Sequence, residues 1–239
     1  DYELFDASRT KVILDDWYVL RDPRQFYYGN WTMTRAKQQD AMEASYRFVE
    51  SKNLLDNIPT PVQKLVCDVI LPLRHVAWGG NMNNCNIAAI GYGTVFTAPA
   101  MFHAMDQLGV AQYITRLGLT IGGTEVLDSG KDAWINQPHW QVLRRYIEDT
   151  FVIEDPFELF IAQNIALDGQ LYEMIFESFV EQHLTSKGVS AIAMVTSFIN
   201  DWFKESSRWI DAVIKIAADE SDANNKLIST WVNKWGKRA

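Results

Sequence analysis

Cysteine, proline and glycine are all scarce in this 239-residue sequence, which contains two, seven and thirteen of them respectively. Cys67 and Cys85 stand apart, without a Cys-x-x-Cys pair. A disulfide scaffold and a zinc site are therefore not indicated, and we expect two reduced thiols in a cytoplasmic protein. Short alternating strands between turn residues are also missing, and this absence points to long helices.

Lys and Arg are also outnumbered by Asp and Glu, 22 against 30, so the formal net charge is −8. This balance argues against nucleic acid as the main partner. The basic cluster at Lys234, Lys237 and Arg238 is typical of a solvated tail. No signal peptide is present, and the sequence starts at Asp1 without an initiator methionine, so we expect an N-terminal truncation of a longer protein.

Aromatic residues, in contrast, are abundant: the sequence contains nine Trp, nine Tyr and twelve Phe. Such side chains dominate protein cores and interfaces. Many of them lie in residues 1–33, where Asp22-Pro23 interrupts any helix. We predict an extended or irregular aromatic segment there, followed by a helix at about 34–51 and a turn at 54–59.

Hydrophobic spacing predicts two pairs of long antiparallel helices. The predicted pairs are 61–78 with 82–105, and 157–187 with 190–217. Thr60 is expected to cap the first helix, which should stop at Gly79-Gly80, and Asp155 is expected to cap the third. This pattern predicts an all-α, ferritin-like (ribonucleotide-reductase-like) bundle.

Further helices are expected around this core. They are predicted at 110–119, 138–150 and 226–235, with a turn at 128–130. The whole chain, 1–239, is predicted to be one ferritin-like domain that carries the aromatic segment at its start.

Residues 76–105 carry no formal charge when His103 is taken as neutral. A helix that is apolar on all sides lies either inside a helical core or in a membrane, and a span needs about 20 apolar residues. Asparagines from Asn81 to Asn86 crowd one end, and Pro99 and His103 lie at the other. A buried helix of a soluble protein is therefore predicted.

A ferritin-like bundle raises the question of a diiron site, which needs a Glu from each of two helices and Glu-x-x-His from each of the others. The sequence contains no Glu-x-x-His around His75, His103, His139 or His183. No acid lies between Asp68 and Asp106, so the second predicted core helix offers no carboxylate ligand, and the fourth offers no histidine. We therefore predict no catalytic, cofactor-binding or metal-binding residue in this chain.

The remaining polar residues are interpreted as structural. Each histidine is expected to be hydrogen-bonded in the core or at the surface, and Gly91-Tyr92-Gly93 is expected to allow close helix packing. Surface positions are expected for six acidic residues, with partner contacts as the alternative for the last three: Glu173, Glu177, Glu181, Asp168, Asp201 and Glu205.

Several segments resemble the β subunit of bacterial multicomponent phenol and toluene monooxygenase hydroxylases. These are Trp78-Gly-Gly-Asn-Met-Asn-Asn84, Gly91-Tyr-Gly-Thr94, Met105-Asp-Gln-Leu-Gly-Val-Ala-Gln-Tyr113, Asp16-Trp17 and Arg21-Asp-Pro-Arg-Gln-Phe-Tyr-Tyr28. The resemblance covers essentially the whole chain, and phenol hydroxylase is favoured over toluene or o-xylene monooxygenase.

The resemblance implies a set of partners. The hydroxylase of this family is an (αβγ)2 assembly in which a catalytic α subunit holds the diiron centre and a small γ subunit completes the protomer. A reductase with FAD and a 2Fe-2S cluster supplies electrons from NADH, and a regulatory protein binds transiently. The β subunit shares the fold of α without its ligands, and it scaffolds α for O2-dependent ring hydroxylation.

The aromatic segment is the expected contact with the catalytic subunit, because buried aromatic side chains anchor most interfaces. The candidate interface residues are Trp17, Tyr18, Phe26, Tyr27, Tyr28 and Trp31. The alternative is that half of them fill the chain's own core. At the level of function, the rivals are a self-sufficient ferritin-like diiron protein and a stand-alone helical binding protein. The sequence does not fix the aromatic substrate.

Overall fold

The computed structural model describes residues 6–239, and this part of the chain contains helices and connecting turns but no strands. The predicted all-α fold is therefore confirmed. The helices follow one another as η1 Ala7–Arg9, η2 Trp17–Val19, α1 Tyr28–Ser51, α2 Thr60–Ile70, α3 Leu73–Ile90, α4 Thr94–Asn136, α5 Pro138–Thr150, α6 Pro156–Phe160, η3 Ile161–Leu167, α7 Asp168–Tyr172, η4 Glu173–Leu184, α8 Ser190–Asp219 and α9 Asp222–Gly236.

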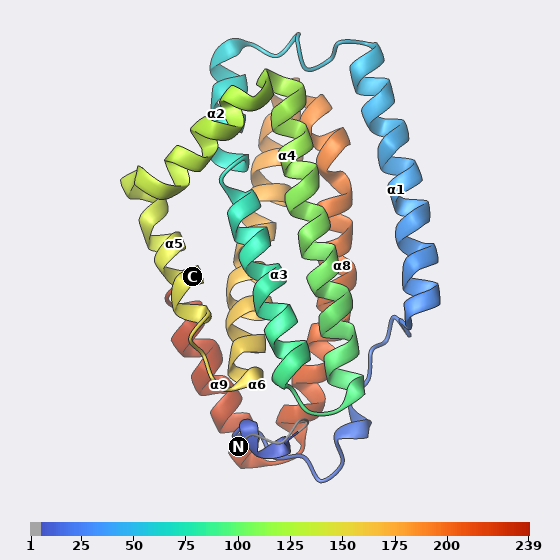
Figure 1. Ribbon diagram of the computed structural model, residues 1–239, viewed down its shortest axis with the longest axis vertical. Coiled ribbons are helices and arrows are strands. Elements are labelled where there is room, and N and C mark those ends of the chain that lie inside the picture. The colour runs from blue at the N-terminus through green and yellow to red at the C-terminus, as the bar shows by residue number, and fades with distance from the viewer. Residues whose placement is uncertain (1–5) are drawn as a thin grey trace.

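Four long helical segments form the centre of the molecule (Figure 1). α3 packs along α4, and η4 packs along α8. The stretch from α6 through η4 is one continuous helix whose η3 and η4 portions are π-helical. α1 stands on one side against α8, while α5 and α9 lie on the other side (Figure 1).

The first predicted pair, 61–78 with 82–105, is wrong in its boundaries. α2 ends at Ile70, because Pro72 blocks its continuation, and α3 begins at Leu73. α3 then passes through Gly79 and Gly80 to Ile90. Both glycines serve close packing, since a Cβ on Gly79 would lie 2.7 Å from Cγ2 of Ile147.

The predicted helix 82–105 is interrupted by a tight reversal at 91–93. Gly93 has a φ of 83°, a conformation that favours glycine, and a Cβ on Gly91 would lie 2.5 Å from the Ile87 carbonyl oxygen. The reversal turns α4 back along α3 as an antiparallel neighbour (Figure 1).

α4 runs much further than expected. The predicted turn at 128–130 is wrong, because these residues are helical, and the actual break lies at Gly122 and Gly123. Gly123 has a φ of 68°. Gly130 instead allows the helix to approach the turn between α2 and α3, since a Cβ there would lie 3.0 Å from Cβ of Leu71.

Two other predicted helices agree with the structure. α5 matches the helix predicted at 138–150, and α8 matches the one predicted at 190–217 within two residues. Asp155 caps α6 as predicted, because its Oδ1 accepts hydrogen bonds from the backbone N–H of Phe157 (2.9 Å) and Glu158 (3.1 Å). Thr60, in contrast, is the first residue of α2, and Pro59 takes the N-cap position.

The aromatic N-terminal segment is irregular from residue 6 to residue 27 apart from η1 and η2, as predicted. Residues 1–5 of that segment lie outside the described part. The predicted start of the next helix is wrong by six residues, because α1 begins at Tyr28. The Asn30 side chain supports this start by accepting a hydrogen bond from the Tyr27 backbone N–H (2.7 Å).

Large aromatic side chains fill the core around the first turns of α4. Phe96 on α4 stacks on Phe157, with ring centroids 5.5 Å apart, and also packs on Phe160. Trp209 on α8 meets Phe160 edge-on at 5.2 Å. Within residues 6–239, none of the helices has the length and apolar character that crossing a membrane requires.

Candidate functional site

The helices of the central bundle bury a cluster of polar side chains, and the bundle core is also where ferritin-like proteins build their metal sites. α3, α4 and the helix from η3 into α7 all contribute to it. The buried polar residues are Asn83, Asn84, His103, Gln107, Gln163, Asn164 and Asp168. Buried polar groups of this kind need hydrogen-bond partners, so their pairing shows what the site can do.

Asp168 lies at the centre of the cluster and is only 2% exposed, so its predicted surface position is wrong. Its Oδ1 accepts a hydrogen bond from the Gln163 amide nitrogen (2.8 Å), and its Oδ2 accepts one from the Gln107 amide nitrogen (3.0 Å). The Tyr172 hydroxyl donates to the Gln107 amide oxygen (2.8 Å). Burial raises the pKa of the Asp168 carboxyl above its usual value and also raises the pKa of the Tyr172 hydroxyl.

His103 is the imidazole of the site. Its Nε2 lies 3.4 Å from the Gln107 amide nitrogen and 3.7 Å from Oδ2 of Asp168. Its Nδ1 has no hydrogen-bond partner among residues 6–239, and the ring meets Trp209 edge-on at 5.9 Å. This histidine is therefore a buried core residue, in agreement with the sequence interpretation.

Amide pairs join α3 to η3. Asn84 and Asn164 exchange two hydrogen bonds of 3.0 Å, each amide nitrogen donating to the other's oxygen. The Asn83 amide nitrogen donates to the Gln163 amide oxygen (2.8 Å) and to the Thr150 hydroxyl (2.7 Å). These amides are thus bound to one another, to Thr150 and to Asp168.

A second buried cluster holds α1 against the bundle. The Arg35 guanidinium donates to Oδ1 (2.7 Å) and Oδ2 (2.6 Å) of Asp106 and also binds Glu205 (2.8 Å). The Trp31 indole N–H donates to the same Asp106 carboxylate (3.2 Å). The second core helix, expected at 82–105, continues in the structure as α4 through Asp106, and the carboxylate of Asp106 is paired with Arg35. The expected surface position of Glu205 is wrong, since its side chain is only 15% exposed.

The buried polar side chains of both clusters do not fit the ligand set of a diiron centre. Such a site uses four carboxylates and two imidazoles, whereas α3 and η3 present amides that already bind one another. The Asp106 carboxylate faces a guanidinium, and Asp168 receives two amide N–H groups. Nowhere in the described chain do three or more His, Cys, Asp or Glu residues gather as metal ligands would.

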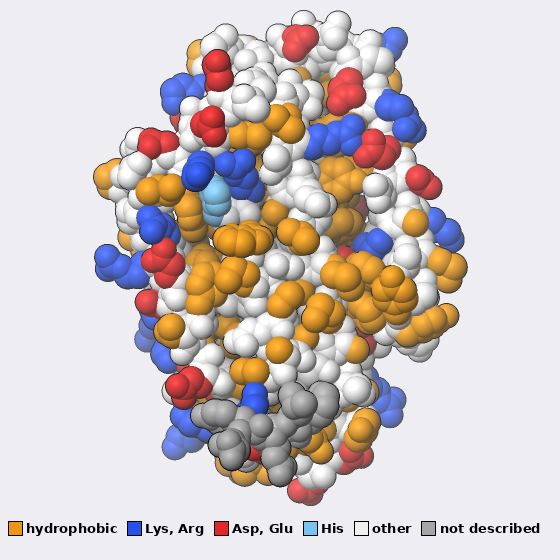
Figure 2. All heavy atoms as spheres, in the orientation of Figure 1, with side chains coloured by type: hydrophobic (Ala, Val, Ile, Leu, Met, Phe, Trp, Pro, Cys, Tyr) orange, Lys and Arg blue, Asp and Glu red, His pale blue; other side chains and the backbone are white. Residues whose placement is uncertain are grey.

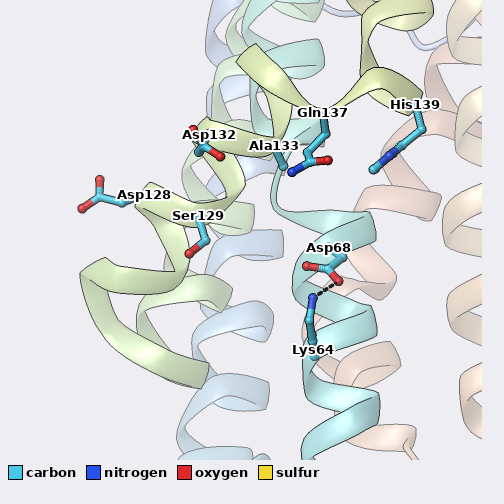
Figure 3. A pocket seen from close by; sticks show the side chains of 8 residues that line it. All are labelled: Lys64, Asp68, Asp128, Ser129, Asp132, Ala133, Gln137 and His139. Atoms are coloured by element: carbon cyan, nitrogen blue, oxygen red, sulfur yellow. Dashed lines mark hydrogen bonds and ion pairs between the residues drawn. The ribbon is translucent and has the colours of Figure 1, made fainter.

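A surface pocket between α2 and the last turns of α4 holds several polar side chains (Figure 3). Lys64 and Asp68 form an ion pair with each other at 2.5 Å, while Asp128 points away from them (Figure 3). Asp132 and His139 belong to separate helices at its rim. The polar side chains of this pocket do not point toward one common position where a ligand could bind, so the pocket is not a candidate site.

The predicted interface residues divide into two groups. Trp17 is buried against Tyr92, and Trp31 stacks on Phe102 at 5.5 Å, so both serve the chain's own core. Phe26 is half-buried and also makes a contact within the chain, because the guanidinium of Arg24 lies over its ring. The exposed group consists of Tyr18, Tyr27 and Tyr28, which are 64–69% exposed.

These three tyrosines line a groove of about 900 Å³ between the N-terminal segment and the start of α4. Its other walls are mainly apolar, from Val95, Ala98, Pro99 and Phe102. The exposed tyrosines thus remain candidate interface residues.

Comparison with known proteins identifies the family. The family model described as Methane/Phenol/Alkene Hydroxylase matches residues 1–221. The oxygenase component DmpL of phenol 2-monooxygenase from Pseudomonas sp. (strain CF600) is 45% identical over 240 residues, which cover 100% of this chain and 72% of the relative. The component MhpL from Acinetobacter pittii (strain PHEA-2) is 40% identical over 95% of this chain and 69% of the relative.

Solved structures agree with the sequence comparison. Xenon-pressurized phenol hydroxylase from Pseudomonas sp. OX1 superposes with a TM-score of 0.94 at 39% identity, over 98% of this chain and 72% of that chain. Toluene 4-monooxygenase shares the fold with a TM-score of 0.89 at 18% identity, over 97% of this chain and 77% of that chain. The predicted ferritin-like bundle and the family resemblance are both confirmed. The chain belongs to the methane/phenol/alkene hydroxylase family.

Proposed function

We propose that this chain is the non-catalytic, β-type subunit of an aromatic monooxygenase hydroxylase. Two relatives at 45% and 40% identity are named as oxygenase components of phenol 2-monooxygenase. A more distant relative from Ectopseudomonas mendocina, 20% identical over 92% of this chain and 68% of the relative, is named as a hydroxylase component subunit beta. The observation that carries the proposal is the Asn84–Asn164 amide pair in the middle of a ferritin-like bundle.

The role of such a subunit is to support a catalytic one. We place the diiron centre in a separate α subunit, where it would supply the O2 chemistry of ring hydroxylation. A small γ subunit would complete an (αβγ)2 assembly. A reductase carrying FAD and a 2Fe-2S cluster and a regulatory protein would bind in turn. The proposed compartment is the cytoplasm, with neither a membrane nor a nucleic acid as a partner.

Phenol is the proposed substrate class of the assembly, because the two relatives above 30% identity are both named for phenol. Toluene is the alternative, supported by the relative from E. mendocina at 20% identity. The exposed tyrosines Tyr18, Tyr27 and Tyr28 are proposed as contacts to the catalytic subunit, since their ring faces and hydroxyls suit an interface.

Metal analysis tests the proposal directly. The full chain is purified alone and together with the proposed catalytic subunit, and iron is measured in both samples. We expect iron only in the co-purified assembly. About two irons bound to the isolated chain would overturn the proposal and favour a self-sufficient diiron protein.

Co-purification tests the tyrosine contacts separately. Replacing Tyr27 and Tyr28 together by Ala should reduce the amount of catalytic subunit recovered with the tagged chain. Val152→Ala is a suitable control, because this side chain is 78% exposed and lies on the loop before α6. Unchanged recovery with the double variant would remove these tyrosines from the interface.

A further inference from the structure

Residues 21–34 connect the N-terminal segment to α1 and include the first turns of that helix. Leu20 before them is 1% exposed, and Met42 after them is 4% exposed. None of the fully buried hydrophobic residues of the described chain lies between these two positions. Residues 21–34, which we name the strap, are therefore flanked by anchored positions but contribute no fully buried apolar side chain of their own.

Two guanidinium groups hold the strap against α8. Cζ of Arg24 lies 4.8 Å from the ring centroid of Phe26 and 5.1 Å from that of Trp209. Cζ of Arg35, just beyond the strap, lies 5.3 Å from the Phe26 centroid and 5.1 Å from that of Trp202. Phe26 thus contacts two cations, and each cation also lies over a tryptophan of α8, where the ring face attracts positive charge.

Opening of the strap would leave no charge stranded in the core. The Arg24 side chain is only 1% exposed, and it donates to both carboxylate oxygens of Asp22 at 2.9 Å. Asp22 belongs to the strap, so this ion pair moves with it. The longer contact of Arg24 with Glu205, at 4.0 Å, is lost, but Glu205 and Asp106 keep Arg35 as their partner. The large cost of a buried charge without its partner is therefore avoided.

A strained residue lies in the turn of the strap. Gln25 has a φ of 55°, in the left-handed region that costs energy for residues other than glycine. The Gln25 N–H donates to the Asp22 carbonyl oxygen (2.9 Å), and the Asn30 amide donates to the Gln25 carbonyl oxygen (2.7 Å). This turn places Arg24 and Phe26 against the bundle. The closed strap therefore carries the strain, and opening releases it.

The strap and α4 together form the groove of about 900 Å³ described above. Tyr27 and other strap residues line one side of it, and residues 94–102 of α4 line the other. Trp31 joins the two sides, because it stacks on Phe102 at 5.5 Å and its indole N–H donates to Asp106 (3.2 Å). Figure 2 shows hydrophobic side chains gathered over the first turns of α1. This apolar surface and the groove depend on the closed strap.

We propose that the strap is a conformational latch, which opens as one unit while the bundle stays folded. Arg24 keeps it closed, and the strain at Gln25 favours opening. Opening dismantles the groove and displaces the exposed tyrosines, so the latch decides whether this surface is available to a partner. The inference goes beyond the proposed function, because it concerns a movement within this chain alone.

Thiol labelling of the full chain measures the opening. Ser206 is 1% exposed and lies 3.5 Å from the Arg24 guanidinium, so the Ser206→Cys variant carries a thiol that reacts when the strap opens. Thr196→Cys is the matched control, because Thr196 lies on the same helix and is 3% exposed. Peptide mass spectrometry separates both from Cys67 and Cys85. Labelling at position 206 should be faster by on the order of tenfold, and low urea should leave its rate unchanged because a local opening exposes little surface.

Substitutions in the strap should change this rate in opposite directions. Arg24→Gln in the Ser206→Cys background removes the cation and should speed labelling by on the order of tenfold. Arg116→Gln is its control, because Arg116 also lies over a ring, that of Tyr46 at 3.9 Å, but outside the strap. Gln25→Gly should slow labelling about two- to fivefold, since glycine adopts a φ of 55° without strain.

Equal labelling of the Ser206→Cys and Thr196→Cys variants, with both rates following global unfolding in urea, would overturn the latch. Faster labelling with Arg116→Gln as well as Arg24→Gln would also contradict it, because the whole of α1 would then be loosening. If Arg24→Gln unfolds the chain, both thiols become reactive and Gln25→Gly decides the matter. Slower labelling confined to position 206 supports the latch, and an unchanged rate refutes it.

Discussion

The Gln163 amide nitrogen donates to the Asp168 carboxylate across 2.8 Å, although the two residues are five positions apart on one helix. In an α-helix this separation places side chains well around the helix from each other. The π-helical turn of η3 brings them together on one side. The carboxylate is thereby turned into the bundle, where Gln107 reaches it from α4.

Asp168→Asn should destabilise the chain, because the new amide N–H group would face the amide N–H groups of Gln107 and Gln163. One unsatisfied buried donor costs about 1–3 kcal/mol. The loss should shrink as pH rises. The folded chain binds the Asp168 proton more tightly than the unfolded chain does, so wild-type stability falls as pH rises through the raised pKa.

Urea unfolding of both proteins from pH 4 to pH 8 measures this effect. A stability difference that stays constant across that range would show that Asp168 is charged in the folded chain at every pH.

Arg35→Leu should be severely destabilising. It leaves the carboxylates of Asp106 and Glu205 without their shared cation, and removing one partner of a buried ion pair costs about 3–5 kcal/mol. Arg35→Lys should cost less, because it keeps the charge while losing the two-pronged contact to Asp106. Denaturant unfolding at pH 7 ranks the two variants, and equal losses would refute the role of the charge.

Gly80→Ala should destabilise by about 1–3 kcal/mol, the usual cost of overpacking a tight core. A Cβ on Gly80 would lie 3.1 Å from Cδ of Gln107 and 3.2 Å from Nε2 of Gln163, which would push both amides off their partners. Gly169→Ala is the control, since nothing lies within 4 Å of its Cβ position and the residue is helical. The control should gain about 0.5–1 kcal/mol through helix propensity. Thermal unfolding compares the two changes.

His75 should stay neutral throughout the physiological pH range. Burial against the stacked Trp134 ring, together with Arg74 and Lys131, lowers its pKa to about 4. The unfolded chain binds this proton more tightly, so stability should fall as pH drops from about 6.5 towards 4. NMR titration of the His75 ring protons checks the value, and a midpoint near 6.5 would contradict it.

The sequence predicted the helical class, the α5 and α8 boundaries and the Asp155 cap, because capping residues and apolar spacing are local signals. It missed the α2–α3 break and the length of α4. The sequence Gly79-Gly80 is typical of a helix end. Only the approach of Ile147 to Gly79, and of Gln107 and Gln163 to Gly80, reveals both as packing positions. Such contacts between distant segments leave no local mark.

The polar site was missed for a related reason. A charged residue is exposed by default, which is why the sequence alone predicts a surface position for Asp168. Its spacing contained a usable signal, since Asp168 follows Asn164 by one helical step and therefore shares the inward side with it. The pairing of Asn84 with Asn164, in contrast, depends on the register between two helices, which spacing within either helix does not determine.

The Asn84–Asn164 pair also bears on what this chain needs in order to fold. Two amides that satisfy each other need no ion to close the bundle, and they carry no charge to be neutralised at any pH. A chain built this way can reach its final shape while iron is scarce.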